Sequence, residues 1–168
     1  MAAGSTYTPI ATTTLGSAQT TITFNSFSGY TDLVLVCNWA QSAIGSCWLR
    51  FNSDSGTNYS FTELRGNGSA ASSTRLSNTA QSYWAYNVFP DTSYTANAII
   101  SIQNYSNATT YKTFLSRANA NSGSYAGTSA IVGLWRSTSA ITSIELDIDG
   151  SATYNTGSTF TLYGILSA

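Results

Sequence analysis

Hydrophobic and polar residues alternate along most of the chain with the two-residue period of β-strands. Short runs of β-branched and aromatic residues are separated by clusters of Gly, Ser and Asn, and no segment repeats its apolar residues with a helical period. The pattern predicts about ten strands and no helix. The expected strands cover residues 20–27, 32–39, 46–51, 58–64, 81–89, 95–105, 110–118, 128–136, 140–148 and 158–166.

The order of these segments predicts an all-β fold. Many short strands with no helix between them are typical of an antiparallel β-sandwich, and we expect a jelly-roll or similar Greek-key topology of about eight to ten strands. The stretches RGNGSAASS (65–73) and NANSGSYAG (119–127) are interpreted as turns. Residues 1–18 are expected to be an N-terminal arm that orders on a neighbour, or an edge segment, because Pro9 is tolerated only at an edge. Residues 19–168 are expected to form a single domain.

The alternation also assigns faces. Segment 32–39 is largely apolar on both sides, which predicts a central strand covered on both faces. In segment 140–148 the apolar residues point inward and the acidic residues outward. The C-terminal segment 158–166 is interpreted as a last strand within a sheet. The expected core consists of Ile22, Phe24, Leu33, Leu35, Leu49, Phe51, Ile100, Ile102, Phe114, Ile131, Leu134, Ile144, Leu146, Phe160 and Leu162.

Charge is scarce in this chain. Only 8% of the residues are charged against 42% hydrophobic, and the net charge is −1, so neutral hydroxyls and amides provide most of the polarity. No cluster of Lys and Arg favours binding to nucleic acid. No apolar run approaches the roughly 20 residues of a membrane helix. The N-terminus lacks the pattern of a signal peptide. We therefore expect neither a nucleic-acid partner nor a membrane partner.

The two cysteines allow two interpretations. If segments 32–39 and 46–51 form a hairpin, Cys37 and Cys47 point to the same face and are placed to pair as a disulfide. The favoured alternative is two small buried thiols, because nothing in the sequence indicates export to an oxidising compartment.

Catalytic motifs are not found. The chain has no histidine, which removes the commonest general base and metal ligand, and no serine lies in a nucleophile motif. Glu145 and Asp147 could meet the spacing of a glycosidase pair, as could any two acids on one strand face. Asp147 and Asp149 are the calcium candidates. We expect no enzyme activity, no catalytic residue and no cofactor.

Aromatic residues are the second chemical feature, at 13% of the chain. Many would belong to a sandwich core, while Tyr and Trp in polar surroundings also anchor protein interfaces or stack on sugars. Arginines among neutral residues could pair with another chain. The candidate interface residues are Tyr7, Pro9, Ile10, Tyr83, Trp84, Tyr86, Tyr94, Tyr105 and Arg136.

Four stretches of the sequence carry a family resemblance. STYTPIATTTLGSAQTTITF, NYSNATTYKTFLSRAN, VGLWRSTSAITSIEL and GSTFTLYGI resemble small virion proteins of tailed bacteriophages, especially cyanophages. The resemblance covers nearly the whole chain and supplies no functional residues. It implies a β-sandwich, a homo-oligomer on the particle, and assembly in the host cytoplasm with localisation in the virion.

The resemblance leaves two functions open, and a third lies outside it. The first is a capsid decoration (cement) protein that clamps neighbouring capsid subunits, for which a trimer is favoured. The second is a tail-fibre or receptor-binding component that contacts host glycans. The third is a free carbohydrate-binding module. The start at Met with no preceding shaft favours the cement protein, whose partners are other virion proteins, either major capsid or tail proteins.

Overall fold

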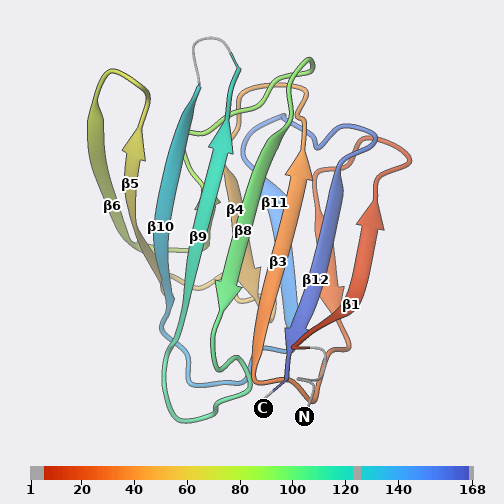
Figure 1. Cartoon of the computed structure of the whole chain (residues 1–168). Helices are drawn as coiled ribbons and strands as arrows, with labels where there is room; N and C mark the ends of the chain where they lie inside the picture. The colour runs from red at the N-terminus through yellow and green to blue at the C-terminus, as the bar shows by residue number, and fades with distance from the viewer. Residues whose placement is uncertain (1–5, 123–125, 167–168) are drawn as a thin grey trace.

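Two antiparallel sheets of unequal width pack face to face in the computed structural model, which describes residues 6–122 and 126–166 (Figure 1). The larger sheet has the order β1-β12-β3-β8-β9-β10-β5-β6, and the smaller one has the order β2-β11-β4-β7. No helix that could span a membrane is found in these residues. The strands are β1 (Tyr7–Thr14), β2 (Ile22–Asn25), β3 (Asp32–Trp39), β4 (Cys47–Phe51), β5 (Tyr59–Gly66), β6 (Ala71–Thr79), β7 (Ser82–Ala85), β8 (Ala96–Ile102), β9 (Lys112–Ala120), β10 (Gly127–Trp135), β11 (Ser143–Ile148) and β12 (Thr159–Ile165).

The connectivity is that of a jelly roll with added strands. The chain crosses from one sheet to the other at β1–β2, β2–β3, β3–β4, β4–β5, β6–β7, β7–β8, β10–β11 and β11–β12. A three-stranded meander, β8-β9-β10, fills the position of a single jelly-roll strand, and β12 and β1 widen the large sheet on its other side. The predicted antiparallel sandwich is confirmed. The predicted number of strands is too low.

The strand predictions hold wherever one face is buried. β3 has the predicted bounds, and β8 to β12 differ from the prediction by a few residues. β6 was missed, because most of its side chains are exposed and it has no apolar alternation. Its first residues fall in a stretch that was interpreted as a turn.

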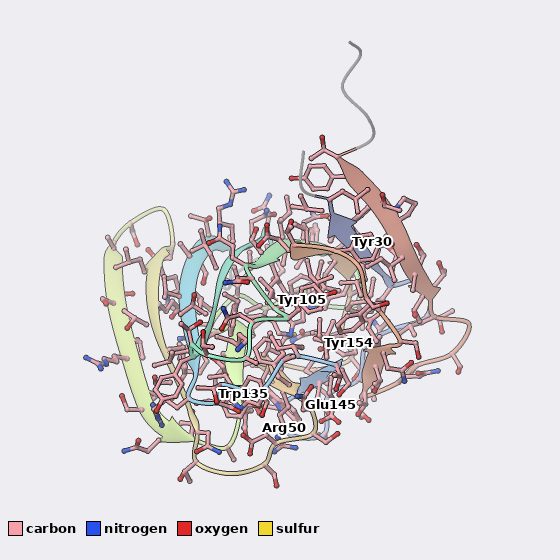
Figure 2. All side chains as sticks on the ribbon, turned by 90° about the horizontal axis from the view of Figure 1, so that it is seen from below. Tyr30, Arg50, Tyr105, Trp135, Glu145 and Tyr154 are labelled. Carbon is pink, nitrogen blue, oxygen red and sulfur yellow. The ribbon has the colours of Figure 1, made fainter. Side chains whose placement is uncertain are left out.

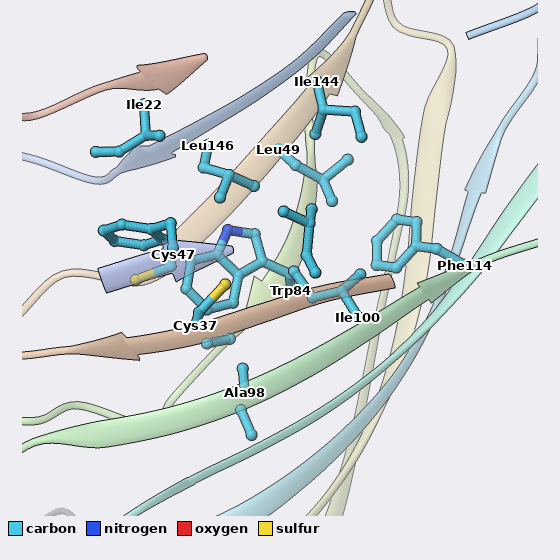
Figure 3. Close-up of a cluster of buried hydrophobic side chains, with 14 of the residues drawn as sticks. Ile22, Cys37, Cys47, Leu49, Trp84, Ala98, Ile100, Phe114, Ile144 and Leu146 are labelled. Carbon is cyan, nitrogen blue, oxygen red and sulfur yellow. The ribbon is translucent and has the colours of Figure 1, made fainter. Parts of the chain in front are cut away.

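The hairpin of segments 32–39 and 46–51, on which the disulfide interpretation depended, is not formed. β3 belongs to the large sheet, where it pairs with β12 and β8, whereas β4 belongs to the small sheet. Cys37 and Cys47 therefore approach each other from facing sheets (Figure 3), and both are buried free thiols. Burial raises the pKa of both thiols, which keeps them protonated and unreactive.

The core lies between the two sheets (Figure 3). Fourteen of the fifteen predicted core residues are buried there. The exception is Leu134, which is only partly buried because it points to the opposite side of β10. Trp135 is in the core instead. Gly133 leaves room for the ring of Phe114, because a Cβ at position 133 would lie 2.1 Å from that ring.

The two ends of the chain meet in the same sheet. β1 is the edge strand next to β12, with a register shift between Pro9 and Ala11, so residues 7–14 form the predicted edge segment of this chain. β12 lies between β1 and β3, and Phe160 and Leu162 are fully buried. The C-terminal strand therefore connects β1 to the rest of the sheet.

One carboxyl group is buried between the sheets. Glu63 on β5 accepts hydrogen bonds from Ser129 Oγ (2.9 Å) and Asn87 Nδ2 (3.2 Å), and is 1% exposed. Burial raises its pKa, although these two hydrogen bonds and the charge of Arg65 act in the opposite direction. The charged form is therefore less favourable in the folded protein than in the unfolded chain.

Leu162→Ala should destabilise the protein far more than Ile165→Ala on the other face of the same strand. Leu162 is fully buried between the sheets, and its loss leaves a cavity that costs about 2–5 kcal/mol. Ile165 is partly exposed and should cost less than about 1.5 kcal/mol. Unfolding in guanidinium chloride measures both values. Equal losses would contradict the assignment of β12 to the core.

Glu63→Gln should stabilise the protein at pH 8 and have a smaller effect at pH 4. The raised pKa means that the folded state binds a proton more tightly, so wild-type stability falls as pH rises from the ordinary carboxyl range through the raised value. Glutamine removes this dependence and can still accept from Asn87, while the Ser129 hydroxyl turns to accept. The unfolding midpoint of both proteins, measured from pH 4 to pH 8, tests this. A difference that does not change with pH contradicts it.

Candidate binding surface

One side of the large sheet is not covered by any other element in the described part of the chain. We call it the outer face, and it faces the viewer in Figure 1. The prediction that β3 is covered on both faces therefore fails at Val36, which is 40% exposed, whereas Val34 on the same face is buried by its neighbours. The outward positions, following the register from β12 to β6, are Thr161, Tyr163, Val34, Val36, Asn38, Asn97, Ile99, Ser101, Leu115, Arg117, Asn119, Thr128, Ala130, Val132, Thr62, Leu64, Ser73 and Arg75.

Apolar side chains form the middle of the outer face. Val36 is paired with Ile99 across β3 and β8, and Leu115 with Val132 across β9 and β10. Val132 is 55% exposed, and Leu64 on β5 is 63% exposed. The two pairs lie diagonally to each other, because Ile99 is paired with Arg117 and Leu115 with Ser101 across β8 and β9, so these side chains form an apolar patch that Arg117 and Ser101 interrupt. Exposed apolar side chains gathered in this way are typical of an interaction surface.

One end of the outer face is lined by amides. Asn38 Nδ2 donates to Asn97 Oδ1 at 2.7 Å, and Asn119 follows in register on β9. A shallow depression of about 270 Å³ beside this row is lined in part by Asn97, Arg117 and Thr128. A second depression, of about 310 Å³, lies at the apolar patch between Leu115 and Val132. The outer face therefore offers an apolar region with a neutral polar margin.

Two arginines on the outer face have no ionic partner among the described residues. Arg117 and Arg75 are both exposed, and the ion pair that the structure contains is Arg50–Glu145 on the small sheet, at 3.7 Å (Figure 2). The one acidic residue that shares this side of the strands is Asp32, which accepts the Asn104 N–H at 2.7 Å. The outer face is therefore cationic, whereas the other basic side chains contact their own chain. These are Arg50, Arg65, Lys112 and Arg136.

The predicted N-terminal interface residues lie beside the outer face. Tyr7 and Pro9 are exposed and pair with Ile165 and Tyr163 of β12. The rings of Tyr7 and Tyr163 meet edge to face at 6.4 Å. Ile10 is partly buried against the core. Tyr7 and Pro9 thus extend this surface, and their role in an interface stays a prediction.

Trp84 and Tyr105 are wrong as interface residues, because both are buried. Trp84 is fully buried, with its indole N–H donated to the Trp48 carbonyl at 3.1 Å, and Tyr105 packs edge to face on Phe27. Tyr83 and Tyr86 are half-buried. Their rings contact Phe61 and each other at the end of the core, so most of their surface is used inside the fold.

The last two predicted interface residues have different surroundings. Tyr94 is 53% exposed in the loop before β8, where its N–H donates to Asp91. Arg136 is partly exposed and donates to the Thr57 carbonyl at 2.8 Å and to Asn78 Oδ1 at 3.0 Å, and its role in an interface stays a prediction. It joins the end of β10 to β5 and β6 within the chain.

The calcium candidates do not form a cluster of ligands. Asp147 accepts hydrogen bonds from Thr21 Oγ1 (2.7 Å) and from the Ile148 N–H (2.6 Å). Burial raises the pKa of Asp149, which disfavours its charged form. Within residues 6–122 and 126–166, no three metal-ligating side chains of the His, Cys, Asp or Glu type come together. Asp147 and Asp149 thus lack the oxygen-rich surroundings that calcium requires.

Sequence reasoning missed the central part of this surface. Ile99, Leu115 and Val132 were assigned to strands but not to a surface. The available signal was that apolar residues occur on both faces of segments 95–105, 110–118 and 128–136, as they do in segment 32–39.

In a comparison with protein-family models no family matches this chain, and a search of the curated proteins finds no match either.

Proposed function

We propose that this protein is a non-enzymatic structural protein that attaches to a larger assembly through the outer face. The single observation that carries the proposal is the uncovered sheet face with its exposed apolar side chains. Eight strands spaced by about 4.8 Å, each about seven residues long, give a face of roughly 34 by 23 Å. Its area is on the order of 800 Å², which is what each partner contributes to an interface of standard size.

The assembly that we propose is a bacteriophage particle, with the protein as a capsid decoration protein. The resemblance of the sequence to small phage virion proteins supports this choice. A rigid sandwich with a broad docking face suits a subunit that clamps its neighbours, since many copies with modest individual affinity add up to strong attachment. A tail location of the same protein is the alternative within this proposal.

A specific observation favours glycan binding as a second candidate function. The amide row of Asn38, Asn97 and Asn119 borders a depression of about 270 Å³. Amides and hydroxyls offer both donors and acceptors to sugar hydroxyl groups. This candidate requires selective binding on a glycan array, whereas a decoration protein should show none.

Val132→Asp should abolish attachment to the particle without unfolding the protein. A carboxylate among these apolar side chains would lose its hydration in the interface, and a loss of at least ten-fold in affinity is expected. Ile44→Asp is the matched control, because Ile44 is 58% exposed in the loop before β4, away from the outer face. Co-sedimentation with capsids assembled without this protein measures the occupancy of each variant.

Three measurements decide between the alternatives. Full occupancy by Val132→Asp, or equal losses in both variants, would overturn docking through the outer face. Electron cryo-microscopy of the particle separates the two locations, since density over the shell lattice supports decoration and density at the tail alone supports the fibre. Selective glycan binding that Asn97→Ala abolishes would support the second candidate function in place of the first.

A further inference from the structure

The four edges of the two sheets differ in how they are protected from pairing with another chain. β2 and β7 are only four residues long. β1 contains Pro9, which lacks an N–H, and a register shift next to it. Short strands, proline and bulges are the usual protections of an edge. The three edges β1, β2 and β7 are therefore poor templates for an added strand.

β6 is less protected, because its one register shift lies at its C-terminal end, between Ser77 and Thr79. It is nine residues long, contains no proline, and pairs with β5 in unbroken register from Ser77 to Ala71. In the described part of the chain only β5 pairs with it, so the backbone groups on its other side have no strand partner. Its side chains are mostly Ser and Thr, which are compatible with an extended conformation. β6 is thus a long and regular open edge.

Arg75 is the central residue of β6, the fifth of nine. It is exposed and has no acidic partner among the described residues. If two copies of the protein paired along the full length of their β6 strands in antiparallel orientation, Arg75 would lie directly opposite Arg75. Like charges in this position are destabilising, so the arginine disfavours self-pairing. An acidic residue in the same position would be stabilised.

We propose that β6 accepts an extended segment of another polypeptide as a ninth strand, and that Arg75 selects a segment with a carboxylate opposite to it. The neighbour of Arg75, Leu76, pairs with Phe61 on the core side of the sheet and is 37% exposed. An added strand with apolar residues on this side would cover Leu76. The fitting partner is therefore a strand with apolar residues on one face and an acidic residue at the middle of the other.

The proposal stands apart from docking through the apolar patch, because it uses the backbone of the sheet edge and Arg75 at the margin of the outer face. The test uses two nine-residue peptides with valine at the even positions and threonine at the odd ones, except for a central glutamate in one and a central lysine in the other. Amide chemical shifts of the ¹⁵N-labelled protein report the titration. We expect shifts concentrated in residues 71–79 and about three- to ten-fold tighter binding of the glutamate peptide.

Arg75→Glu should reverse this preference, so that the lysine peptide binds more tightly. Arg117→Glu is the matched control, since Arg117 is an exposed arginine of the same sheet three strands from the edge, and the glutamate peptide should remain preferred. The proposal would be overturned if neither peptide binds, if the wild type binds both peptides equally, or if the amide chemical shift changes lie away from β6. A concentration-dependent dimer of the wild type that Ser73→Pro dissociates would also overturn it, in favour of a second copy.

Discussion

The structure depends on the packing of an eight-stranded sheet against a sheet of only four strands. At the centre of the contact, Trp39 of β3 and Trp84 of β7 meet edge to face with 4.8 Å between ring centroids, and both are fully buried. Their indole N–H groups are satisfied by Gln41 Oε1 and the Trp48 carbonyl. Buried aromatic pairs of this kind contribute about 0.5–1.5 kcal/mol beyond the area that they bury. The inner face of the large sheet is nevertheless wider than the small sheet, so its margins need other cover.

Aromatic side chains provide that cover at both margins. On the β5 side, Phe61 is covered by Tyr83 and Tyr86. On the β12 side, the ring of Tyr154 packs edge to face on Phe160 at 5.0 Å, and Tyr154 is also fully buried. The high aromatic content of the chain is therefore explained in large part by the mismatch between the sheets. For the same reason the aromatic stretches that resembled a binding surface in the sequence are mostly structural.

The sequence predicted the inner faces of the strands well and the arrangement of the sheets poorly. Alternation identifies a strand when one face is buried, as in β3 and β11, but β6 has neither face buried and gave no signal. Leu134 was placed in the core although it is out of phase with Ile131, because Gly133 occupies the inward position and its lack of a side chain breaks the apolar pattern. The pairing of β3 with β12 joins residues far apart in the chain. No local pattern encodes that choice, so the sequence alone could not assign the neighbours of β3.

The centre of the outer face around Arg117 and its margin at the β6 edge are electrostatically separate, although they belong to one sheet. Four of the six basic side chains are engaged within the chain, and in a protein with so few charges the two that remain, Arg75 and Arg117, dominate the local field. They lie three strands apart, which is about 14 Å at the spacing of a sheet. The Debye length at physiological ionic strength is about 8 Å, so each charge is largely screened from the other. A partner at the edge therefore changes the potential on the outer face little. For this reason the sandwich can be held on an assembly by its face while its edge stays open to a second chain.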